Sequence, residues 1–125
     1  MAEDDVAVRE LFEFVLIDAG HEVESVADGL EALYLYEPGR FDLLCLDLAM
    51  PQLSGTQLTR AVRHLARDHH TPILMITSSL SPEGRAEAHA AGITAMLTKP
   101  INLEELRDAV TSLLKPLRED TPETS

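Results

Sequence analysis

The chain has 125 residues, which is enough for one domain with a single core and leaves no room for a second. Its 22 acidic and 10 basic residues give a net charge of −12, which opposes binding to nucleic acid or to an anionic membrane surface. A single cysteine, Cys45, excludes an intrachain disulfide, and the acidic residues 1–5 differ from the basic start of a signal peptide. We therefore expect a soluble, cytoplasmic protein.

Five helices are predicted, most of them from apolar residues that recur every three or four positions, the period of a helix with one buried face. In chain order they cover residues 8–19, 30–36, 58–65, 81–92 and 102–117. The side chains expected in the core are Val8, Leu11, Phe12, Val15, Leu16, Ala19, Leu30, Leu33, Tyr34 or Tyr36, Leu58, Ala61, Val62, Leu65, Leu103, Leu106, Val110, Leu113, Leu114 and Leu117.

Residues with strong preferences for helix ends support these boundaries. Gly20 and Gly92 follow the first and fourth helices, where glycine is common because it readily adopts a left-handed backbone conformation. The fourth helix opens with Ser81-Pro82, and the last with Asn102 and Glu105 in the spacing of a capping box.

Partial alternation at residues 21–27 and short apolar runs at residues 43–46, 73–76 and 93–97 predict four strands. Strands that alternate with helices indicate an α/β fold, in which a doubly wound parallel sheet carries helices on both faces. We assign residues 1–118 to this domain and the polar residues 119–125 to a disordered tail.

Three of the predicted strands are followed at once by a polar side chain: Asp47, Thr77 and Lys99. In a parallel sheet the carboxyl ends of the strands meet at one edge, and ligands bind there. The acidic residues Glu3, Asp4 and Asp5 precede the first helix, and we expect them at the same edge. Taken alone, Asp47 would be read as a turn or helix-capping residue.

Carboxylates, a hydroxyl and an ammonium at one edge of the sheet favour a reactive site over a purely structural role for Asp47. Clustered carboxylates repel one another unless they bind a hard cation, and Mg²⁺ takes one or two carboxylates together with phosphate oxygens. A phosphoryl group at Asp47 would find Thr77 and Lys99 as partners for its oxygens. The residues therefore predict phosphoryl transfer to a carboxylate, catalysed by positioning and charge neutralisation.

Five segments with this chemistry follow one another in a set order. They are the acidic cluster at residues 2–5, the helix start at 8–11, residues 46–51 with Gly55, the strand end at 76–78, and residues 98–100. In this order and spacing the chain resembles the receiver domain of response regulators in two-component signalling, from Glu3 to about Leu117. The resemblance implies a flavodoxin-like fold with strand order 2-1-3-4-5.

The resemblance also implies a role for each site residue. Asp47 would be the phosphoacceptor. Asp4 and Asp47 would bind Mg²⁺ directly, Glu3 would act through a water molecule, and Ala49 would offer its backbone carbonyl. The hydroxyl of Thr77 and the ammonium of Lys99 would contact the phosphoryl oxygens, and the Lys99-Pro100 bond is expected to be cis.

These roles imply a phosphorelay rather than an enzyme with an external substrate. A histidine kinase or phosphotransfer protein would supply the phosphoryl group, and the signal would pass to an unidentified partner protein. The chain would catalyse only transfer to Asp47 and hydrolysis from it. An aspartyl-phosphate hydrolase is a third reading, but Ala49 stands where such enzymes carry a second aspartate.

Two departures from the family pattern leave a second function open. Only Met1 and Ala2 precede the acidic pair, so the first strand is expected to be missing. Burying four apolar strand residues contributes about 6–12 kcal/mol, so we expect a marginal fold, or a true start upstream of Met1. Met96 stands where receivers carry a switching Tyr or Phe. Both departures favour a degenerate receiver that serves as a docking module without phosphorylation.

Overall fold

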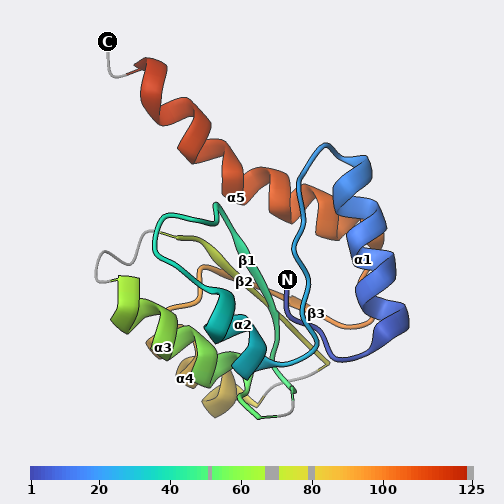
Figure 1. The fold of residues 1–125 in the computed structure, drawn as a ribbon, viewed down its shortest axis with the longest axis vertical. Helices are drawn as coiled ribbons and strands as arrows, with labels where there is room; N and C mark the ends of the chain where they lie inside the picture. The colour runs from blue at the N-terminus through green and yellow to red at the C-terminus, as the bar shows by residue number, and fades with distance from the viewer. Residues whose placement is uncertain (51, 67–70, 79–80, 124–125) are drawn as a thin grey trace.

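The computed structural model describes residues 1–50, 52–66, 71–78 and 81–123 (Figure 1). The elements along these residues are α1 (Val6–Asp18), α2 (Gly29–Leu35), β1 (Leu44–Asp47), α3 (Gly55–Ala66), β2 (Ile73–Thr77), α4 (Pro82–Ala91), β3 (Ala95–Thr98) and α5 (Leu103–Glu123). Strands and helices alternate from β1 onward, and all strand pairs are parallel. The predicted α/β fold with five helices is therefore confirmed.

The central strand β2 organises the sheet, whose order is β1-β2-β3. All five residues of β2 are buried, as expected for an apolar strand that is covered on both faces. The register pairs Asp47 with Ile76, and Thr77 with Thr98. Because the strands are parallel, the residues that end them lie at the same edge of the sheet.

Helices cover both faces of the sheet (Figure 1). The face beneath α1 and α5 has a core of Phe12, Leu16, Cys45, Leu74, Ile76, Leu106, Val110 and Leu114. The face beneath α2, α3 and α4 has a core of Ala2, Val26, Tyr36, Leu46, Met50, Leu58, Val62, Ile73, Met75, Ala88 and Ile93. Burial of these apolar side chains is the main favourable contribution to the stability of the fold.

The helix ends follow the signals in the sequence. The side chain of Ser81 accepts a hydrogen bond from the Gly84 N–H at 3.0 Å, and α4 begins at the next residue. Gly92, directly after α4, has a φ of 115°, a left-handed conformation that glycine adopts without strain. Asn102 Oδ1 accepts hydrogen bonds from two N–H groups in the first turn of α5, at 2.8 and 3.2 Å.

The predicted strand at residues 21–27 is not formed, so the described residues hold three strands rather than four. Within this segment only Val26 forms an isolated parallel bridge, with Ala2. Ala2 also bridges to Leu46 of β1, with its N–H 2.9 Å from the Cys45 carbonyl oxygen. A strand needs a paired neighbour along its length, and residues 1–3 hydrogen-bond to this segment at Glu24 and Val26, near its end.

The same bridges show where the first strand of the fold would lie. Met1, Ala2 and Glu3 run between the segment that leads into α2 and the strand β1, as Figure 1 shows for the N-terminus. The order is therefore residues 21–26, then residues 1–3, then β1, β2 and β3. This arrangement agrees with the implied order 2-1-3-4-5, with the first strand reduced to one bridged residue.

Three side chains that the helical period placed in the core are on the surface. Leu11, Leu30 and Leu65 have 46%, 53% and 48% of their surface exposed. The buried stripe of α1 is narrow and centred on Phe12 and Leu16, so Leu11, one position away, lies at its solvent edge. An apolar period therefore indicated the helix but overestimated the width of its buried face.

The last helix continues beyond the expected domain end. α5 runs to Glu123, so residues 119–123 of the expected tail are helical, whereas 124 and 125 lie outside the described residues. In Figure 1 this end of α5 projects away from the other elements. A helix satisfies its backbone hydrogen bonds internally, so it can extend past the sheet without packing against it. The division at residue 118 stays a prediction.

Candidate functional site

Asp47 is the last residue of β1, and only 5% of its surface is exposed. Its backbone N–H donates to the Ala2 carbonyl oxygen at 2.9 Å, which ties the strand end to the N-terminal segment. One side-chain oxygen, Oδ1, accepts a hydrogen bond from the Ala49 N–H at 3.3 Å. The short apolar strand thus holds a nearly buried carboxylate at the edge of the sheet.

Glu3 lies beside Asp47 because residues 1–3 pair with both flanking segments. It is even more deeply buried, with 2% of its surface exposed. The Asp5 N–H donates to its Oε2 at 3.1 Å, and the Arg9 guanidinium donates to its carbonyl oxygen at 2.9 Å. Arg9 was not predicted to be a site residue. The only indication in the sequence is that it is a cation near the start of the helix that follows the acidic residues.

Lys99 joins the two buried carboxylates. Its Nζ lies 3.3 Å from Glu3 Oε1 and 3.3 Å from Asp47 Oδ2, and its side chain is 27% exposed. The Lys99 N–H donates to the Thr77 carbonyl oxygen at 2.7 Å. The Lys99-Pro100 peptide bond is cis, as expected. Three segments far apart in the sequence therefore meet in one ion-paired group.

Burial and the charges of Glu3, Asp47 and Lys99 shift the pKa values of Glu3 and Lys99. Burial raises the pKa of Glu3, the hydrogen bond from the Asp5 N–H opposes this shift, and the charge of Asp47 adds to it. For Lys99, burial alone would lower the pKa, but the charges of Asp47 and Glu3 outweigh burial and raise it. The pKa values of Glu3 and Lys99 thus both depend on the charges of the neighbouring side chains.

Thr77 and Ala49 are placed at the site by backbone contacts. Thr77 ends β2, is 3% exposed, and holds Lys99 through its carbonyl oxygen. Ala49 is exposed and donates its N–H to Asp47. The predicted contact of the Thr77 hydroxyl with a phosphoryl group and the predicted role of the Ala49 carbonyl as a metal ligand stay predictions.

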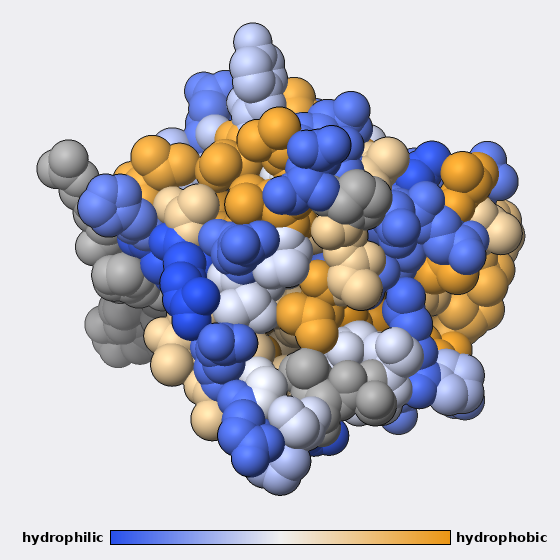
Figure 2. All heavy atoms as spheres, turned by 90° about the horizontal axis from the view of Figure 1, so that it is seen from below, coloured by the Kyte–Doolittle hydropathy of each residue, from blue (hydrophilic) through white to orange (hydrophobic). Residues whose placement is uncertain are grey.

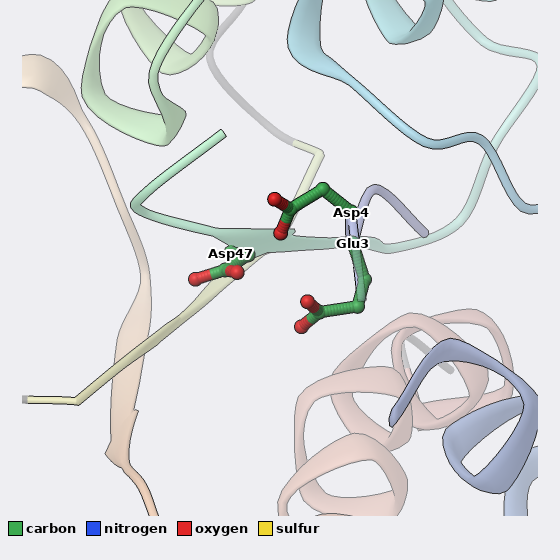
Figure 3. Close-up of side chains that lie close together, drawn as sticks. All are labelled: Glu3, Asp4 and Asp47. Carbon is green, nitrogen blue, oxygen red and sulfur yellow. The ribbon is translucent and has the colours of Figure 1, made fainter. Parts of the chain in front are cut away.

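Glu3, Asp4 and Asp47 form a cluster of carboxylates (Figure 3). One oxygen of each lies within 4.8 Å of the others. Glu3 and Asp47 are buried and Asp4 is exposed, so one side of the cluster is open to solvent. Three carboxylates face a single ammonium here, and oxygen ligands of this charge fit a hard divalent cation such as Mg²⁺.

Gly55, at the start of α3, allows the chain to pass close to Asp47. A Cβ atom at this position would lie 2.6 Å from the Asp47 carbonyl oxygen and 2.8 Å from the Met75 sulfur. Both distances are shorter than van der Waals contacts. The Gly55 N–H donates to the Leu48 carbonyl oxygen at 2.9 Å, so the close approach fixes the turn that follows Asp47.

The surface at this end of the molecule is mixed in character. Figure 2 views the molecule from below Figure 1 and shows hydrophilic and hydrophobic residues side by side. No helix among the described residues is long and apolar enough to cross a membrane.

Comparison with known proteins assigns the family. The protein-family model of the response regulator receiver domain matches residues 1–111 of this chain. The chain belongs to the response regulator receiver family. Among solved structures, the receiver resembles the chemotaxis protein CheY4 of Vibrio cholerae, with a TM-score of 0.84 and 40% identity, over 90% of this chain and 94% of that one.

A second solved structure bears on the acidic cluster. The receiver domain of the sensor histidine kinase PA1611 of Pseudomonas aeruginosa, described with a magnesium ion coordinated in its active-site cleft, has a TM-score of 0.82 and 28% identity. The match covers 91% of this chain and 93% of that one. Receiver domains bind Mg²⁺ at an acidic site, and the cluster of Glu3, Asp4 and Asp47 is a group of this kind.

Two curated relatives are longer than this receiver. The response regulator MprA of Mycobacterium leprae is 38% identical over 118 residues, which are 94% of this chain and 51% of MprA. The transcriptional regulatory protein CiaR of Streptococcus pneumoniae is 35% identical over 116 residues, 92% of this chain and 50% of CiaR. The chain thus spans about half the length of the curated relatives it matches.

Proposed function

We propose that this receiver accepts a phosphoryl group on Asp47 in a two-component phosphorelay. The observation that carries the proposal is the position of Asp47, a 5% exposed carboxylate at a strand end, paired with Lys99 and clustered with Glu3 and Asp4. A buried carboxylate that only stabilised the fold would need its ammonium partner and no further acids. Two additional carboxylates favour a cation, and a cation beside a nucleophile favours phosphoryl transfer.

In the proposed reaction, Asp47 is the nucleophile. A carboxylate oxygen of Asp47 attacks phosphorus, the bond from phosphorus to the donor nitrogen or oxygen breaks, and its electron pair leaves with the donor. When bound, Mg²⁺ supplies positive charge for the phosphoryl oxygens. Glu3, Asp4 and Asp47 would hold it, with the Ala49 carbonyl as a further ligand. Lys99 would then transfer its ion pair from Asp47 to the new phosphoryl group.

The donor and the target belong to the same proposal. Receiver domains interact with histidine kinases and effectors, and we infer that a histidine kinase or phosphotransfer protein in the cytoplasm supplies the phosphoryl group. The output would be a change in affinity for a partner protein, without contact with nucleic acid or membrane. The net charge of −12 agrees with a protein partner, because it disfavours binding to anionic nucleic acid or membranes.

Incubation with acetyl phosphate and Mg²⁺, followed by intact mass spectrometry, tests the phosphoacceptor. We expect the mass of one phosphoryl group to be added to the wild-type chain, none to Asp47→Asn, and none when EDTA removes the metal. The matched control is Asp42→Asn, because Asp42 is an exposed acid outside the cluster on the approach to the same strand. Equal labelling of Asp47→Asn and wild type would contradict the proposal.

A docking module that works without phosphorylation is the second candidate. One observation favours it: Met96 in β3 has no aromatic ring that could change orientation. If a correctly folded chain gains no phosphoryl group in the labelling experiment, this candidate replaces the first.

A further inference from the structure

Arg9, near the start of α1, contacts the backbone of the acidic cluster. Its guanidinium Nη1 donates a hydrogen bond to the Glu3 carbonyl oxygen at 2.9 Å, and this contact is partly buried. The oxygen belongs to the peptide unit that joins Glu3 to Asp4. Because a peptide unit is planar, a restraint on its carbonyl also restrains the backbone from which both acids extend.

The start of α1 fixes the place from which Arg9 reaches this peptide unit. The side chain of Asp5 accepts a hydrogen bond from the Val8 N–H at 3.1 Å and so caps the helix. The Arg9 N–H donates to the Asp5 carbonyl oxygen at 2.9 Å, in the pattern of an α-helix. Arg9 therefore reaches back to Glu3 from backbone that the helix holds in place.

The conformation of this peptide unit matters because Glu3 and Asp4 are neighbours in the sequence. Neighbouring side chains of an extended segment point to opposite faces. Glu3 is buried and Asp4 is exposed, yet one oxygen of each lies within 4.8 Å of the other and of an Asp47 oxygen. The chain bends at Asp4, and Figure 3 shows both carboxylates on the Asp47 side of the backbone. Their convergence thus depends on the peptide unit between them.

The two acids differ in what else holds their side chains. The Glu3 carboxylate accepts a hydrogen bond from the Asp5 N–H at 3.1 Å, and Lys99 Nζ lies 3.3 Å from its Oε1. Within the residues that the structure describes, the Asp4 carboxylate has no hydrogen bond or ion pair. The direction of the Asp4 side chain is therefore set by its backbone, and Arg9 restrains the peptide unit that precedes it.

The partner of Arg9 is a neutral carbonyl group, and the ion pairs of the cluster among the described residues involve Lys99. A guanidinium near three carboxylates nevertheless contributes positive charge, and positive charge disfavours a second cation. The two roles of Arg9 therefore predict opposite effects of its removal. Loss of charge alone would strengthen Mg²⁺ binding, whereas loss of the restraint on the peptide unit would weaken it.

We propose that Arg9 is a positioning residue of the cation site. Its hydrogen bond holds the peptide unit between Glu3 and Asp4 in the conformation that brings both carboxylates together with Asp47. Groups that orient metal ligands without touching the metal contribute about 10–100-fold to metal affinity. The assignment rests on the cation site of the proposed function, and it is independent of phosphorylation because Mg²⁺ binding needs no phosphoryl donor.

Three substitutions test this role. Arg9→Met keeps the aliphatic stem and the helix propensity but removes the guanidinium. Arg9→Lys keeps the charge and a donor for the carbonyl oxygen. Arg85→Gln removes an exposed cation from α4, on the opposite face of the sheet, and controls for net charge. Isothermal titration calorimetry with Mg²⁺ measures the dissociation constant, and a stabilising osmolyte in every sample keeps the chains folded.

We expect Arg9→Met to raise the Mg²⁺ dissociation constant at least about tenfold, and Arg9→Lys to stay within about threefold of wild type. Arg85→Gln should leave the constant unchanged or lower it slightly. In metal-free protein, hydrogen exchange of the Asp5 N–H, which donates to Glu3, should accelerate at least about fivefold in Arg9→Met. A residue that only stabilised the fold would not change the metal affinity of the folded chain.

Mg²⁺ binding by Arg9→Met that is as tight as in wild type, or tighter, would overturn the assignment and leave Arg9 as a source of charge only. Equal weakening in Arg9→Lys and Arg9→Met would also overturn it, because the Glu3 carbonyl oxygen needs only one donor. A wild-type chain that binds no Mg²⁺ would remove the site itself. Weaker binding in Arg9→Met, together with no phosphoryl labelling of wild type, would support the role of Arg9 and refute only the phosphoacceptor.

Discussion

Lys99 Nζ lies 3.3 Å from Asp47 Oδ2, and the same nitrogen is 3.3 Å from Glu3 Oε1. One ammonium therefore compensates two buried carboxylates that are distant from each other in the sequence. This shared pairing makes the stability of the fold depend on the charge balance of the site.

Lys99→Ala should destabilise the protein by about 2–3 kcal/mol, since it leaves two carboxylates buried without their cation. The estimate is reduced from that for a fully buried pair because the Lys99 side chain is 27% exposed. Urea denaturation measures the change, and Arg85→Ala, which removes an exposed cation from α4, is the control. We also expect added Mg²⁺ to stabilise Lys99→Ala more than wild type. The same response in both proteins would argue against a metal at this cluster.

Asp4→Asn should weaken Mg²⁺ binding at least about tenfold, because it removes a charged ligand from the open side of the cluster. The thermal midpoint without metal should change little, since Asp4 is exposed. Isothermal titration calorimetry measures the affinity, with Asp42→Asn as the control for charge. Unchanged affinity in Asp4→Asn would exclude Asp4 from the ligand set.

Gly55→Ala should both destabilise the fold and slow labelling of Asp47. A Cβ at this position would lie 2.6 Å from the Asp47 carbonyl oxygen, so the backbone beside the nucleophile must move. Overpacking of this kind costs about 1–3 kcal/mol. Gly84→Ala, within α4, is the matched control, and it should be neutral or stabilising because alanine favours a helix. Denaturation and acetyl phosphate labelling of the two variants would be compared.

Alkaline pH should destabilise the protein through Cys45. Burial raises the pKa of its thiol from 9.0 to about 11. The thiol of the unfolded chain ionises first, so this contribution to stability is present below pH 9 and is lost as pH rises toward 11. The loss amounts to about 2–3 kcal/mol. Denaturation of wild type and Cys45→Ala at about pH 8 and about pH 11 isolates it. Parallel losses in both proteins would contradict the prediction.

Local signals in the sequence predicted the helices and much of the site. The limits of α4 follow from Ser81 and Gly92, whose preferences act within a few residues and need no tertiary contact. Parallel strands with polar ends must present those ends at one edge, so Asp47 and Lys99 were expected to meet, and they do. The acidic cluster of Glu3, Asp4 and Asp47 was expected because Glu3 and Asp4 precede the first helix and could lie at the same edge as Asp47.

Tertiary structure decided what depends on neighbours distant in sequence. Residues 21–25 have strand-like alternation, but they meet the N-terminal segment through the Glu24 carbonyl oxygen and are not paired along their length, so they form no strand. Ala2, in contrast, is bridged on both sides. The helical period of the apolar residues wrongly predicted that Leu11 is buried. The width of the buried face of a helix depends on the elements that pack against it. Burial of Glu3 and its pairing with Lys99 required the whole sheet to be assembled.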